Sequence, residues 1–348
     1  MALSDKQQVP EPDPGSGDPT DFWSWWLDEG ADACETAIES RSFEAVSDEI
    51  NTRVHAVDPR LVWELGPGRE ARHVLVVTSE GDAGARAVAR RWLRAAPAAT
   101  ATWEYADARQ AEVDVDAMVL KIGETEVDFA AVRVVAERVG NHVDVVVHHP
   151  AMAALPEQAR NTVAFLALDA TLGENDCETW VGAVEVALAP PVGATLLSAL
   201  RDAVEEVRAD SVDEHGTPVW VLLRGEVDGA PIMAAAQVPL AGSWAPHLDT
   251  HLAVDVPYRR ATEQGLPDPG TLESLRALED HLGDRLGDSA RLVAHETSAG
   301  TRTLHFYADS TAPAAAVVEA AVTGWDQGAV TVAAQPDPAW HAVRHLRT

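Results

Sequence analysis

The residue types that could bind a transition metal occur together in the middle of the sequence. Imidazole, carboxylate and thiolate groups are the usual ligands of such metals. Two of the histidines are adjacent on an expected strand, so their side chains point to opposite faces and reach one ion only through a bulge. We therefore interpret the set as strand-end histidines followed by a Gly-Glu turn at a helix C-terminus, and expect no metal and no cofactor. The residues concerned are His142, His148, His149, Asp169, Glu174 and Cys177.

Other catalytic signatures are weaker. No Gly-x-Ser-x-Gly elbow accompanies the histidines, which argues against a Ser-His-Asp hydrolase. The string Gly66-Pro-Gly-Arg-Glu-Ala71 superficially matches a dinucleotide fingerprint. A strand is expected after it rather than the helix N-terminus that would face a pyrophosphate, so we predict a hairpin there. His281, His295 and His305 are interpreted as ordinary polar residues, and no catalytic residue is assigned.

Charge and cysteine content restrict the partners. Among 348 residues, 56 Asp and Glu oppose 26 Lys and Arg, giving a formal charge of -30. This balance argues against nucleic-acid binding, which needs a basic footprint, and permits a basic protein partner. A solvated acidic surface without a docking role is the stronger explanation of the charge, and an acidic docking face is the alternative. Two cysteines, no apolar signal segment and no run of eighteen apolar residues predict a cytoplasmic protein outside the membrane.

Residues 251–335 set the predicted architecture of the C-terminal domain. Alternating apolar residues predict strands over 251–256, 291–295, 303–308 and 329–333. Asp268 caps a leucine-striped helix that ends at Gly287, and a second helix runs from about Thr311 to Gly324. The order strand, helix, strand, strand, helix, strand is the ferredoxin-like arrangement, with both helices on one face. The opposite face is expected to be open, and its candidate interaction residues are Asp255, His305, Tyr307 and Thr331.

Residues 218–340 resemble a bacterial family, domain of unknown function 695. The resemblance rests on the strand that opens with Trp220, the Asp228-Gly229 hairpin, the segment from Leu266 to Asp280, the His305-Phe306-Tyr307 strand and the closing Asp337-Pro338-Ala339-Trp340. It implies the same fold with an added N-terminal hairpin and names no reactive residue. A core of this kind is also similar to the acidic inhibitor known as regulator of ribonuclease E activity B, by analogy of fold alone.

The N-terminal half is predicted to be an antiparallel sheet with packed helices. The aromatic cluster of Phe22, Trp23, Trp25 and Trp26 is interpreted as a helix clamped onto the core, with a docking anchor as the alternative. Segments Leu168-Asp169 and Leu172-Gly173-Glu174 are weakly similar to a second uncharacterised bacterial family, which implies no activity. Expected strands are 61–65, 73–78, 102–105, 117–122, 126–129, 131–139, 142–149 and 180–188.

The sequence thus predicts an α+β protein with a disordered tail over 1–18, an N-terminal domain over 19–210 and a C-terminal domain over 217–345. We expect a non-catalytic regulatory or interaction protein that binds another protein. The alternative is an enzyme of unfamiliar type with its site between the two domains. A deep pocket lined by convergent His, Asp and Glu would favour the enzyme, whereas a shallow interface would not.

Overall fold

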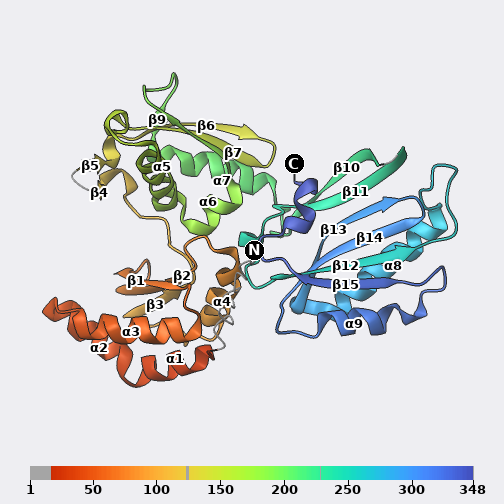
Figure 1. Cartoon of the computed structure of the whole chain (residues 1–348), viewed down its shortest axis with the longest axis horizontal. Coiled ribbons are helices and arrows are strands. Elements are labelled where there is room, and N and C mark those ends of the chain that lie inside the picture. The colour runs from red at the N-terminus through yellow and green to blue at the C-terminus, as the bar shows by residue number, and fades with distance from the viewer. Residues whose placement is uncertain (1–16, 123–124, 228, 348) are drawn as a thin grey trace, which may run out of the picture. The chain divides into compact units, whose positions relative to one another are not determined.

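The computed structural model describes residues 17–122, 125–227 and 229–347 (Figure 1). Its contacts divide the chain into two compact units, Met1–Ala108 and Arg109–Thr348. The predicted boundary between 210 and 217 lies within the second unit and stays a prediction. Of the predicted tail, residues 1–16 lie outside the described residues, and Asp18 is the N-cap of the first helix. Within the described residues no helix has the length and apolar character needed to cross a membrane.

The first unit packs helices against a small sheet. The aromatic cluster lies inside this packing: Phe22, Trp23 and Trp26 are at most 3% exposed, and the indole of Trp23 donates to the Trp92 carbonyl at 2.8 Å. The interpretation as core is therefore confirmed. The elements are α1 (Pro19–Trp25), a π-helical turn (Trp26–Gly30), α2 (Ala31–Ser40), α3 (Glu44–Val57), β1 (Val62–Pro67), β2 (His73–Thr78), α4 (Ala83–Arg94) and β3 (Trp103–Ala106).

The second unit begins with a four-stranded sheet in the order β8-β7-β6-β9, together with the separate hairpin β4-β5. Gly173, at a φ of 82°, separates α5 from α6, and α6 is a helix that the sequence did not predict. The elements are β4 (Val119–Ile122), β5 (Thr125–Asp128), β6 (Arg133–Val139), β7 (His142–His148), α5 (Glu157–Leu172), α6 (Glu174–Trp180), β8 (Val181–Ala187), β9 (Thr195–Leu196) and α7 (Leu200–Asp210).

The antiparallel prediction for the N-terminal half is wrong for two strand pairs. Strands β2 and β3 pair in parallel, and so do β7 and β8. Helix α4 connects the first pair, and α5 with α6 connects the second. A helical crossover returns the chain to the end of the sheet at which the first strand began, so the two strands that it joins run in the same direction. The α+β class itself is confirmed.

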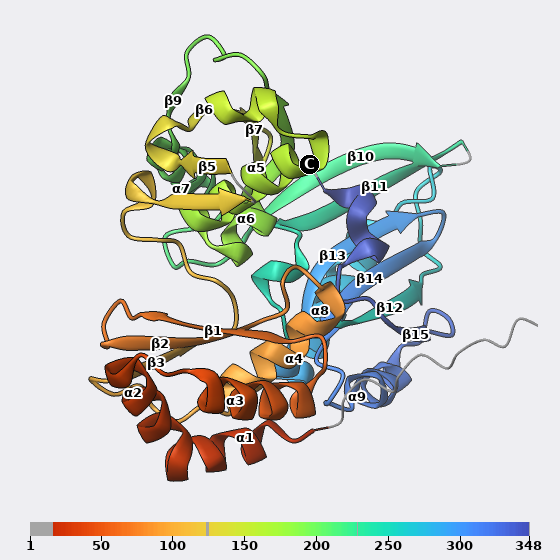
Figure 2. The same cartoon turned by 60° about the vertical axis from the view of Figure 1, so that its left-hand side comes forward.

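The C-terminal part of the second unit is one six-stranded sheet in the order β10-β11-β13-β14-β12-β15. Figure 2 shows β10 and β15 at its opposite edges. All its pairs are antiparallel, and the predicted element order over 251–335 is present. The elements are β10 (Val219–Val227), β11 (Ala230–Val238), β12 (Thr250–Pro257), α8 (Pro269–Leu286), β13 (Ala290–Ser298), β14 (Thr301–Ala308), α9 (Ala314–Ala321) and β15 (Thr331–Pro336).

Helices α8 and α9 share one core with the sheet. Leu275, Leu282 and Leu286 of α8 and Val318 of α9 are buried against the strands, as the leucine stripe predicts. Asp268 caps α8 by accepting from the Thr271 amide at 2.8 Å, which starts the helix at the predicted position. The closing strand β15 pairs with β12 and not with the hairpin strands, so β12 lies between β14 and β15.

Leu278 tests the edge of this core. Its side chain is only partly buried, at the border of the leucine stripe. We therefore expect Leu278→Asp to lower the free energy of unfolding by about 1–2 kcal/mol, less than a fully buried leucine would cost. Urea denaturation of the full chain measures this, with Leu278→Ala as the uncharged control. A stability equal to that of the wild type would show that Leu278 lies outside the buried stripe.

Candidate functional site

The candidate metal ligands are engaged in local structure. His148 and His149 are about 5% exposed; His148 Nδ1 lies 2.8 Å from the Ala187 carbonyl, and His149 Nδ1 accepts from the Ala151 amide at 3.0 Å. Burial raises the pKa of the Asp169 carboxyl and also that of the Cys177 thiol. Among the residues that the structure describes, no three His, Cys, Asp or Glu side chains are placed to hold an ion. The absence of a metal from the protein stays a prediction.

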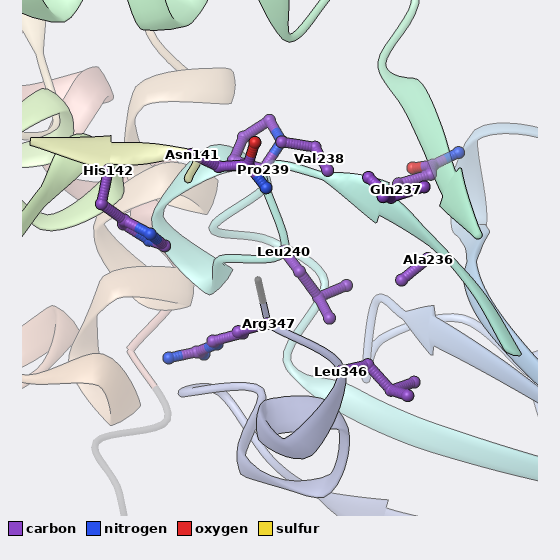
Figure 3. A pocket seen from close by; sticks show the side chains of 10 residues that line it. Asn141, His142, Ala236, Gln237, Val238, Pro239, Leu240, Leu346 and Arg347 are labelled. Carbon is purple, nitrogen blue, oxygen red and sulfur yellow. The ribbon is translucent and has the colours of Figure 1, made fainter. Parts of the chain in front are cut away.

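A pocket lies where the two predicted domains meet within the second unit. Its polar lining includes Asn141, His142 and Arg347, and Figure 3 shows Val238 and Pro239 at its border. Burial and the nearby Arg347 charge lower the pKa of His142. The free volume of about 10 Å³ has room for a single water molecule. This pocket is therefore too small for a substrate, and no convergent carboxylate side chains line it among the residues that the structure describes.

The face predicted to be open is covered at two of its four residues. Tyr307 is fully buried: it stacks on Trp340 with ring centroids 4.3 Å apart, and its hydroxyl donates to Asp337 at 2.6 Å. His305 is 7% exposed and lies 3.0 Å from His251. The prediction of an open face is therefore wrong at His305 and Tyr307. The segment after β15, which ends in the short 3-10 helix His341–Leu346, packs over the sheet there.

The other two residues of that face are more accessible. Thr331 is exposed on the edge strand β15, and Asp255 is half-buried beside it. The Asp255 carboxylate accepts from the Thr303 hydroxyl at 2.7 Å and lies 3.4 Å from the Thr331 hydroxyl. These contacts satisfy the carboxylate within the sheet. A binding role for the four residues stays a prediction, and the structure directs attention to the opposite face.

An open groove lies on that opposite face, between α8 and the strands β10 and β13. Trp220 of β10 borders it and is 41% exposed. From α8, Glu279, Asp280 and Asp284 line it, and Gly283 leaves space between the last two. The groove encloses about 480 Å³, which is enough for a large side chain or a short segment of chain.

Each wall of the groove has a distinct chemistry. Trp220 stacks on His295, with ring centroids 5.9 Å apart and planes 27° apart. Burial, reinforced by the charges of Arg302 and Arg276, lowers the pKa of His295 to about 4, so this imidazole is neutral at pH 7. The aromatic wall therefore carries no positive charge of its own under physiological conditions.

The acidic wall is only partly neutralised. Arg302, 6% exposed, donates to Glu279 at 2.7 Å, while burial raises the pKa of that carboxyl. Asp280 and Asp284 are exposed and, within the described part of the chain, make no hydrogen bond or ion pair. Like charges one helical turn apart repel each other, by about 0.2–0.5 kcal/mol in isolated helices. A cation between them would relieve that repulsion.

Sequence reasoning did not single out this groove. Trp220 and Asp280 were noticed only as features of the family resemblance, and His295 as an ordinary polar residue. The usable signals were two Asp residues at i and i+4, Asp280 and Asp284, and a tryptophan on a strand whose two faces are both rich in apolar residues. Neither signal reveals that α8 and β10 border one groove, since the two segments are far apart in sequence.

The C-terminal part of the chain is similar to a known protein family. Residues 219–345 match the model of a family described as a family of unknown function, DUF695. All residues of the groove lie within the matched range. No curated protein and no solved structure matches the chain.

Proposed function

We propose that the C-terminal module binds another protein, and that the groove beside Trp220 receives a lysine or arginine side chain of that partner. One observation carries the proposal: an exposed indole and two unpaired carboxylates border the same open groove. An indole face attracts a cation through its quadrupole, and carboxylates attract it by charge. The net charge of -30 would also speed the approach of a basic partner at low salt.

The alternative of an enzyme with a site between the predicted domains receives less support. The pocket at that place has room for one water molecule, and its described lining contains no convergent acidic side chains. A protein-binding role needs no such pocket, only a groove with complementary chemistry. The proposed location remains the cytoplasm, and the two buried cysteines, Cys34 and Cys177, which are free thiols in the structure, are compatible with it.

Titration with a single side-chain mimic tests the groove directly. Nα-acetyl-arginine amide is expected to shift the indole N–H signal of Trp220, which is assigned as the one that disappears in Trp220→Phe. The citrulline analogue has a similar shape and no charge, so it is expected to leave the signal in place. Because the carboxylates are exposed, the arginine effect is expected to weaken between about 0.05 and 0.3 M salt.

Two paired substitutions separate groove charge from overall charge. Asp280→Asn with Asp284→Asn is expected to weaken arginine-amide binding about five- to tenfold, from the loss of two exposed ion pairs. Glu319→Gln with Asp326→Asn removes the same charge from exposed sites outside the groove lining and is expected to change little. Gly283→Leu is expected to fill the groove, since an added Cβ meets no atom within 4 Å. Equal binding of the arginine and citrulline amides, or equal effects of the two charge pairs, would contradict the proposal.

A further inference from the structure

Strand β10 leaves a long edge of the six-stranded sheet without a partner strand. In the residues that the structure describes it pairs with β11 alone, from Val219↔Val238 to Val227↔Ala230 with no register shift. Proteins usually blunt such edges with short strands, prolines or bulges. Strand β10 has no proline and no bulge, and it opens with the apolar run Val-Trp-Val-Leu-Leu. An edge of this type is a template for another strand.

The pairing register indicates which backbone groups face outward. Val227 and Ala230 are the last partners of the ladder, and ladder partners this close in sequence exchange both of their hydrogen bonds. Alternate residues back along the strand as far as Val221, including Leu223, therefore face β11 with their amides, whereas the Val219 amide donates to the Ser211 carbonyl at 3.0 Å. The intervening residues Trp220, Leu222 and Arg224 present N–H and C=O groups to the open edge.

The same alternation aligns the open edge with the groove. Side chains at Trp220 and Leu222 project to the α8 side of the sheet, where Trp220 borders the groove; Leu222 is 71% exposed. Leu223 projects to the other side and packs against the cluster that contains Tyr307 and Trp340. A strand added beside β10 would place every second side chain next to Trp220 and towards the α8 carboxylates.

We infer that β10 binds an extended segment of a basic protein as a seventh strand, with one lysine or arginine of that segment entering the groove. This inference rests on the proposed function and adds the mode of binding to it. Strand addition obtains affinity from main-chain hydrogen bonds and specificity from alternate side chains. Charge complementarity selects the occupant: the unpaired groups at the groove are Asp280 and Asp284, whereas a second copy of this chain would add another net charge of -30.

A displayed library of random ten-residue peptides, selected on the full chain, provides the probe. The enriched peptides are expected to carry β-branched residues with Lys or Arg at positions of a single parity. Their binding is expected to protect the amides of Trp220, Leu222 and Arg224 from hydrogen exchange. Methylation of the peptide amides that face β10 is expected to weaken binding at least tenfold, whereas methylation of the amides that face away is expected to have little effect.

Arg224 offers a matched pair of variants. Arg224→Pro removes an outward N–H from the edge while leaving the β11 ladder in place, a position at which proline is tolerated. Arg224→Pro is expected to weaken binding of the enriched peptides at least tenfold and to leave arginine-amide binding unchanged. Arg224→Ala is expected to weaken neither interaction. The peptide methylation series tests the same hydrogen bonds on the unmutated chain, so the test remains valid if Arg224→Pro unfolds.

The possible outcomes separate the two proposals. Peptides that bind equally to wild type and Arg224→Pro, without protection of the edge amides or sensitivity to methylation, would overturn strand addition and leave the groove proposal intact. Failure to enrich any peptide, or concentration-dependent pairing of the chain with itself through β10, would also overturn the inference. If peptides bind through β10 but arginine amide does not bind and Asp280→Asn with Asp284→Asn has no effect, the proposed cation site is wrong.

Discussion

Replacing Trp340 with alanine is expected to lower the free energy of unfolding of the C-terminal sheet by about 3–5 kcal/mol. The side chain is 1% exposed and stacks on Tyr307 at a centroid distance of 4.3 Å. Its indole donates to the Leu248 carbonyl at 2.9 Å. Alanine would leave a cavity over the sheet and remove the donor to that carbonyl.

Trp340 also holds the covering segment, residues 337–346, against the sheet. Asp337, the first residue of that segment, accepts from the Tyr307 hydroxyl and from the backbone amides of His341 and Ala342, the last two at 2.8 Å each. Val343 and Leu346 of the following 3-10 helix are buried in the same cluster. Loss of Trp340 is therefore expected to loosen the segment and to expose Tyr307.

Hydrogen exchange of the β12 and β14 amides under denaturant measures this effect separately from the first unit, whose amides serve as an internal reference. Trp340→Phe keeps an aromatic stack and loses the donor, so it is expected to cost about 1–2 kcal/mol. Tyr307 is expected to be less accessible to modifying reagents in Trp340→Phe than in Trp340→Ala. Unchanged exchange in Trp340→Ala would show that the segment after β15 does not contribute to the stability of the sheet.

Elements whose sequence signals lie within one short segment could be predicted, and elements without such local signals could not. The helix from Pro269 was predicted correctly because its cap, its leucine stripe and its terminating Gly287 all lie within one short segment. The cover over Tyr307 was missed because it comes from a short 3-10 helix, which has no extended periodicity to detect. Short 3-10 helices of this kind are recognised only from the residues that they bury in the structure.

The strand directions and the groove were missed for a second reason. Parallel pairing of β7 with β8 depends on the path of α5 and α6, and each strand taken alone gives no direction. The groove joins Trp220 to Asp280, sixty residues further along the chain. Pattern analysis identifies elements, whereas a site built from two elements depends on their packing. This is why the predicted interaction residues include none of the groove, although the order of strands and helices over 251–335 was predicted.

Acidification is expected to destabilise the C-terminal sheet before the ordinary carboxylates titrate. Burial, together with the neighbouring His305, lowers the pKa of His251 to about 4, against the opposing charge of Asp337. Burial with Arg302, Arg276 and His305 lowers that of His295 to the same value. Unfolded histidine has a pKa near 6.5, so in both cases the unfolded state binds protons first.

The direction of the stability change and its pH range follow from these pKa values. The stability contributed by each neutral imidazole is fully present above about pH 6.5 and is lost as the pH falls towards 4. Between pH 7 and pH 5 this amounts to about 1–2 kcal/mol for each histidine. Glu279 and Asp169, whose carboxyl pKa values are raised by burial, act in the opposite direction. A difference between wild type and variant therefore isolates the imidazoles.

Urea denaturation of the full chain at pH 7, 6 and 5, followed by exchange of the β13 and β14 amides, measures the loss. His251→Gln and His295→Gln are each expected to remove about half of the pH-dependent loss in the free energy of unfolding, whatever stability each variant loses at pH 7. The double variant is expected to remove most of that pH-dependent loss. The exposed His215, which is 77% accessible and lies outside the sheet, provides the control in His215→Gln, whose profile is expected to match that of the wild type. A profile in the double variant as steep as in the wild type would show that these histidines already bind protons near pH 6.5 in the folded state. The stacking of His251 on His305 and of Trp220 on His295 would then involve charged rings, and the aromatic wall of the groove would repel a cationic side chain as the pH falls below neutrality.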